Sequence, residues 1–81
     1  MKTFLEHINE NIFDQTLQEL LAKGNRTDPA DDPILNKHVE TARKYFLKFA
    51  TKNNWDETEA KKRCLLYITT AYQNADKEAQ E

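Results

Sequence analysis

Six basic residues near the middle of the chain are the side chains best suited to binding chemistry, because ammonium and guanidinium groups bind phosphates and carboxylates. Three of them recur every four residues and the other three are consecutive: Lys44, Lys48 and Lys52, then Lys61, Lys62 and Arg63. A spacing of four places side chains on one side of an α-helix. If the two segments fold back on each other, the cations meet in a basic corner beside Trp55.

Three interpretations of these cations stay open. They can contact DNA without reading its sequence, pair with an acidic protein surface, or form a solvated helix face. Residues 1–32 hold three basic and seven acidic residues, whereas residues 33–63 hold eight basic and four acidic ones. Opposite charges in separate regions favour head-to-tail self-association or an acidic partner.

Candidate residues for catalysis or metal binding do not form a motif. His7, His38 and Cys64 are far apart in sequence and belong to no C-x-x-C or H-x-x-x-H pair. The single glycine cannot build a phosphate-binding loop, and a Cys–His nucleophile would need a pocket that short helices rarely offer. We therefore expect a protein that is not an enzyme and has no cofactor or metal.

Length and composition predict one helical domain over residues 1–81. The chain has 38% hydrophobic and 32% charged residues, so its core is expected to be thin. One glycine and two prolines leave little material for turns, which favours long helices. A lone cysteine fits a reducing compartment, and no apolar run is long enough to span a bilayer, so the cytoplasm is the expected location in the absence of other signals.

Apolar residues at helical spacing predict three helices near residues 3–23, 33–52 and 57–76. Capping boxes start at Thr3, Thr16 and Asp56, and the one at Thr16 leaves open whether the first region is one helix, which we prefer slightly, or two. Gly24 suits a left-handed C-terminal cap, and residues 75–81 are expected to fray.

Two Asp-Pro steps separate the first helix from the second. Asp32 suits an N-cap and Pro33 the first helical position, so the second step fixes where the next helix starts. The first step, Asp28-Pro29, is expected to keep the preceding loop extended. The predicted fold is all-α: an antiparallel helical hairpin (33–52 and 57–76) crossed by the N-terminal helix.

The run Cys64-Leu-Leu-Tyr-Ile68 is too apolar for a helix that buries only one side. At about 100° per residue, Leu66 points about 200° away from Cys64. Either the first helix covers this side, or Leu66 and Tyr67 are exposed and meet another protein chain. We prefer a protein partner, because a thin core often needs an oligomer to support it.

From Asp31 onward the chain resembles the small helical head–tail connector proteins of tailed bacteriophages. The resemblance rests on "DDPILNKHVETARKYFLKF" followed by "KNNWDETEAKKRCLLYITTAYQNADKEAQ": an acidic loop, an amphipathic helix with a central alanine and later aromatics, a polar corner, and a helix with an apolar run. The corner is shorter than is usual in that family.

The resemblance implies a ring of identical subunits that docks on the portal, lengthens the DNA channel and receives the tail. Its location would then be the virion or the host cytoplasm. The alternative is a small cytoplasmic regulator or inhibitor, phage-encoded or immunity-type, that binds a host protein.

Overall fold

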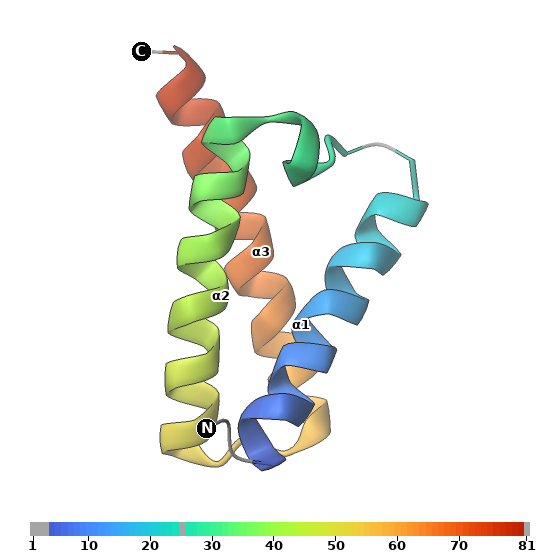
Figure 1. The fold of residues 1–81 in the computed structure, drawn as a ribbon, viewed down its shortest axis with the longest axis vertical. Coiled ribbons are helices and arrows are strands. Elements are labelled where there is room, and N and C mark those ends of the chain that lie inside the picture. Colours follow the sequence, from blue (N-terminus) through green and yellow to red (C-terminus); the bar gives the residue numbers. More distant parts are fainter. Residues whose placement is uncertain (1–3, 25, 81) are drawn as a thin grey trace.

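The computed structural model describes residues 4–24 and 26–80, and this part of the chain is all-α, with three helices and no strand. Helix α1 spans Phe4–Ala22, α2 spans Pro33–Asn53 and α3 spans Glu57–Gln80, and a short 3₁₀ turn, η1, spans Pro29–Asp31. Helices α2 and α3 run antiparallel side by side, and α1 lies obliquely across them (Figure 1). The predicted fold class is confirmed.

The first region forms a single helix, α1, although it contains a second capping box. The hydroxyl of Thr16 donates a hydrogen bond of 2.8 Å to the carbonyl of Ile12 inside the helix, so Thr16 does not cap a new one. The other predicted box begins at Thr3, which lies outside the described residues. Gly24 ends the helix in the left-handed region at φ 85°, as predicted, and its N–H bonds to the carbonyl of Leu21.

The loop before α2 corrects one prediction. Asp28 itself has extended angles, but Pro29 opens the turn η1 instead of continuing an extended segment. The reason is that the Asp28 carboxylate accepts a hydrogen bond of 2.9 Å from the N–H of Ala30, which caps the turn. The second Asp-Pro step acts as predicted: Asp32 accepts from the first N–H groups of α2, and Pro33 takes its first position.

A tight corner joins α2 to α3. Asn54 adopts left-handed angles (φ 52°) and ends α2, and the N–H of Trp55 bonds back to the carbonyl of Ala50. The Asp56 carboxylate then accepts a hydrogen bond of 2.8 Å from the N–H of Glu59, as expected for an N-cap. The corner therefore turns the chain within three residues and sets α3 antiparallel to α2.

The core lies where the three helices meet, and Phe46 is at its centre. The Phe46 ring is fully buried and lies 5.9 Å from the ring of Phe13, 6.2 Å from that of Trp55 and 6.1 Å from that of Tyr67. Small residues on the hairpin complete the core and allow the helices to approach closely: Ala42, Ala50, Ala60, Cys64, Ala71 and Ala75.

The end of α3 corrects a second prediction. Residues 75–80 do not fray but continue the helix to Gln80. Ala75 is buried in the core, and the Glu78 carboxylate lies 3.1 Å from the ammonium of Lys37 and 3.5 Å from Nε2 of His38. Contacts with the first turns of α2 thus hold a segment whose own sequence is polar.

This anchor is expected to weaken in acid. The hydrogen bond from Lys37 lowers the pKa of Glu78, and the charges of Lys37 and His38 lower it further. A depressed carboxylate pKa stabilises the fold above the unfolded-state pKa, and this contribution is lost as the pH falls below about 4. Backbone chemical shifts should show the last turn of α3 losing helicity over that range. In Glu78→Gln the turn should already be frayed at pH 7, and an unchanged α3 in that variant would contradict the anchor.

No helix in the described ranges is long and apolar enough to cross a membrane.

Candidate functional site

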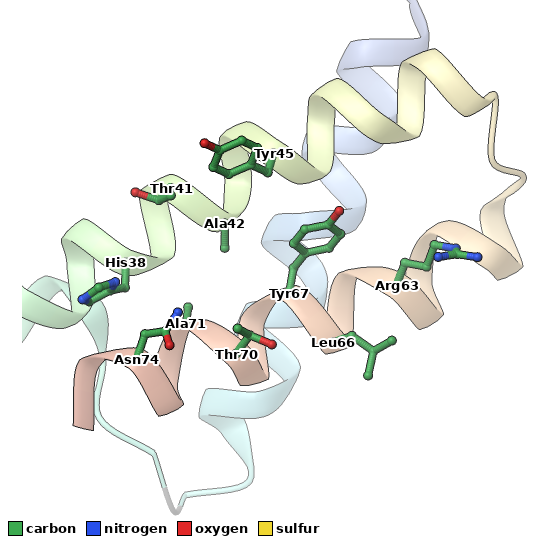
Figure 2. Close-up of a pocket in the computed structure, with 10 residues that line it drawn as sticks. All are labelled: His38, Thr41, Ala42, Tyr45, Arg63, Leu66, Tyr67, Thr70, Ala71 and Asn74. Atoms are coloured by element: carbon green, nitrogen blue, oxygen red, sulfur yellow. The ribbon is translucent and has the colours of Figure 1, made fainter. Parts of the chain in front are cut away.

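A groove of about 460 Å³ runs between α2 and α3. Its lining comes from these two helices alone, so it opens on the face of the hairpin that α1 leaves uncovered (Figure 2). We call it the α2–α3 groove. Its lining residues are His38, Thr41, Ala42, Tyr45, Arg63, Leu66, Tyr67, Thr70, Ala71 and Asn74.

The walls of the groove are largely apolar. Ala42 and Ala71 carry small side chains that leave space between the helices, and Tyr67 points from α3 towards α2 (Figure 2). The ring of Tyr67 is held by its edge-on contact with Phe46. Leu66 and Tyr45 form the rim and remain 61% and 48% exposed. The groove thus combines a fixed aromatic wall with an exposed apolar rim.

The apolar run of α3 is divided among three sides of the helix. Cys64 and Ile68 are fully buried in the core, and Leu65 faces a crevice between α1 and α3 that Thr16 and Glu19 also line. Leu66 projects away from both. Helix α1 therefore does not cover Leu66. Of the two alternatives for this side chain, coverage by the first helix or exposure, the isolated chain shows exposure.

Two basic side chains line the groove, one at each end, and none of the lining residues is acidic. His38 is at the end near Asn74, and Arg63 is at the end near the α2–α3 corner (Figure 2). Arg63 packs over the ring of Trp55 at 4.8 Å and is paired with Glu59 one turn earlier. The Nε2 atom of His38 is buried without a hydrogen bond in the described structure, at 3.5 Å from the Glu78 carboxylate.

Three exposed lysines follow the outer edge of α2 beside the groove: Lys44, Lys48 and Lys52. Between them, the rings of Tyr45 and Phe49 stack at 6.4 Å and 16°, and the ammonium of Lys48 lies 5.9 Å from the centre of the Phe49 ring. This edge of α2 therefore alternates cations with aromatic rings.

The consecutive cations of α3 do not share one side, so the predicted basic corner is only partly formed. Lys61 lines the crevice towards α1 and pairs with Glu57 at 3.2 Å, Lys62 is exposed, and Arg63 lies at the end of the α2–α3 groove. Successive residues of a helix project about 100° apart, so three cations in a row point in three directions. Of the predicted residues, Arg63 is the one that packs on Trp55.

The residues considered for catalysis or metal binding are not brought together. Among the described residues, no group of three or more His, Cys, Asp or Glu side chains is placed to bind a metal ion. Cys64 is fully buried, and this burial raises the pKa of its thiol to about 11, against smaller opposing effects from Thr16 and Arg43. Such a thiol packs as a small apolar side chain.

We expect Cys64 to be nearly inert in the folded protein. Its raised pKa alone lowers the thiolate fraction at pH 8 by about 100-fold relative to an ordinary cysteine, and burial blocks access as well. A chromogenic disulfide reagent should react slowly with the native chain and rapidly in 6 M guanidinium chloride. Rapid reaction without denaturant would show that the packing around Cys64 opens readily.

The sequence indicated Leu66, Tyr67 and Arg63 as surface residues for a partner, but not the opposite wall of the groove. The prediction did not include Thr41, Tyr45 and His38 as binding residues, because they lie at the margin of the apolar stripe of α2. These three residues are three and four positions apart in the sequence, and this spacing places them on one side of α2. No protein-family model, curated protein or solved structure matches the chain.

Proposed function

We propose that this chain is a non-enzymatic assembly protein that acts by binding other protein subunits through the α2–α3 groove. The observation that carries the proposal is the exposure of Leu66, Tyr45 and part of Tyr67 around a preformed hollow in a chain of 81 residues. An exposed apolar patch with charged and polar residues around it is typical of protein interfaces.

The form of this function that we propose first is a ring subunit similar to a phage head–tail connector. Its support is the placement of charge. Asp28, Asp31 and Asp32 lie in the loop before α2, whereas Lys52 lies about 30 Å further along the helix at 1.5 Å per residue. Acidic and basic regions at opposite ends of one subunit suit a head-to-tail contact, which closes into a ring when the rotation between subunits allows it. Such a ring would act in the virion or during assembly in the host cytoplasm.

The second candidate is a small cytoplasmic regulator that binds one host protein. The groove itself favours this alternative, because it is large enough to receive side chains from a partner without self-association.

A double charge reversal, Lys48→Glu with Lys52→Glu, tests the ring. Both lysines are exposed and opposite the core, so the fold should be retained. We expect self-association, measured by sedimentation equilibrium over a range of protein and salt concentrations, to fall at least about ten-fold in affinity as two attractions become repulsions. Retention of DNA is measured in parallel, since a channel lined by lysines would bind it weakly, without sequence preference and with a steep salt dependence.

The outcomes separate the roles of these cations. Loss of assembly with unchanged DNA retention supports a contact between subunits, and loss of DNA retention alone supports a DNA channel. If neither self-association nor DNA retention changes, the lysines along the edge of α2 contact only solvent. If the wild-type chain is also monomeric at all concentrations, the ring is wrong and the regulator becomes the better candidate.

A further inference from the structure

The geometry points to a specific occupant of the α2–α3 groove: we propose that it receives an acidic amphipathic helix from a different protein. This inference rests on the proposed function, because it names the kind of partner that the groove binds. Shape, charge at the groove ends and charge along its edges each contribute to the argument.

The shape of the groove suits a helix. On α3 the lining runs from Arg63 to Asn74, which corresponds to about 16 Å or three helical turns. Helix α1 packs on the other face of the hairpin, so a helix in the groove would give α2 and α3 a neighbour on both faces. Leu66, Tyr45 and Tyr67 would contact apolar residues spaced three and four apart on the incoming helix.

The charge of the groove selects an acidic helix. None of its lining residues is acidic, His38 and Arg63 are basic, and exposed lysines extend along both edges: Lys44, Lys48 and Lys52 on α2, and Lys62 and Lys77 on α3. Glu59 offsets the charge of Arg63, and Glu78 offsets that of Lys37, so the exposed lysines along the edges supply the charge that a partner meets. Carboxylates flanking the apolar side of a bound helix would therefore meet cations on both sides.

The same charges disfavour a second copy docked groove to groove. Two grooves facing each other would bring lysine-edged surfaces together, and like charges across an interface cost affinity and select against that pairing. A helix of opposite charge is the complementary occupant.

A pair of designed peptides tests the proposal. Each is a fluorescein-labelled 15-residue helix with leucine at positions 3, 7, 10 and 14, and the polar positions are glutamate in one and lysine in the other. We expect fluorescence anisotropy to show the glutamate peptide binding at least about ten-fold more tightly in 50 mM salt, with the difference narrowing as salt is raised.

Neighbouring residues of α3 give matched variants. Leu66→Asn should weaken binding of the glutamate peptide at least about five-fold, since it removes an apolar contact without changing charge. Leu65→Asn, on the side that faces α1, should leave it unchanged. Backbone amide shifts on adding the peptide should map to Thr41, Thr70 and Ala71.

Three results would overturn the inference: equal binding of both peptides, no binding of either, or equal effects of the two asparagine variants. Its failure can be told apart from that of the proposed function. If neither peptide binds but Leu66→Asp abolishes self-association, the groove takes a second copy and the assembly function stands. If no peptide binds and no variant alters self-association, both proposals fall.

Discussion

Replacing Phe46 by alanine is expected to cost about 3–5 kcal/mol of folding free energy, the largest effect of any substitution considered for this protein. The ring is fully buried and contacts three other aromatic rings, one from α1, one from α3 and one from the corner between α2 and α3. Its removal leaves a cavity at the point where all three helices meet. Because small domains have a total stability near the low end of about 5–15 kcal/mol, a large fraction of Phe46→Ala should be unfolded at 25 °C.

Urea denaturation followed by circular dichroism at 222 nm measures this cost. The matched control is Phe49→Ala, which changes the same residue type three positions later on the same helix. Phe49 is partly exposed and stacks on Tyr45, so its replacement should cost about 1 kcal/mol, in line with an exposed aromatic pair. Equal destabilisation by the two variants would mean that Phe46 is not the centre of the core.

Leu66→Asp is expected to have the largest effect on binding with little effect on folding. Leu66 is 61% exposed on the rim of the α2–α3 groove, so the folded chain loses little buried area when it is replaced. Aspartate is a poorer helix former than leucine, and the cost to stability should stay within about 0.7 kcal/mol. At an interface the same change buries a charge against apolar side chains, so affinity for a protein partner in the groove should fall at least about ten-fold.

Thermal melts measure the stability, and fluorescence anisotropy with the glutamate peptide measures association in the groove. Leu65→Asp is the control, because it adds the same charge one residue earlier, on the side that faces α1. It should leave association intact. If Leu66→Asp unfolds the isolated chain, Leu66 belongs to the core and the main support for a binding groove is lost. If both variants lower association equally, the added charge and not the lost leucine is responsible.

Local signals in the sequence determined the helices and most of their ends. Apolar residues at spacings of three and four give α1, α2 and α3, and the start of α2 at Pro33 follows from the carboxylate of Asp32. These features depend on residues within one turn of each other, so the neighbouring sequence is enough to specify them. The sequence also reduced Leu66 to two alternatives, covered by the first helix or exposed, because a helix cannot bury five consecutive residues on one side.

Only the tertiary structure decided which side α1 covers, and therefore where the groove lies. Periodicity gives the direction of each side chain around its own helix, but not which of two faces of a hairpin receives the third helix. That choice depends on contacts between distant residues, such as Arg43 of α2, which pairs with Asp14 at 2.6 Å and packs over the ring of Phe13 at 4.7 Å.

The same limit explains why the sequence did not show how α3 ends. The last turn of α3 is polar by itself, and in the fold Glu78 in this turn pairs with Lys37, more than 40 residues earlier. The cations at 61–63 are a different case, because the rotation of the helix alone places three consecutive residues on three sides. Sequence determined the elements of this protein, whereas the packing of distant residues decided which of its side chains meet and which surface stays open.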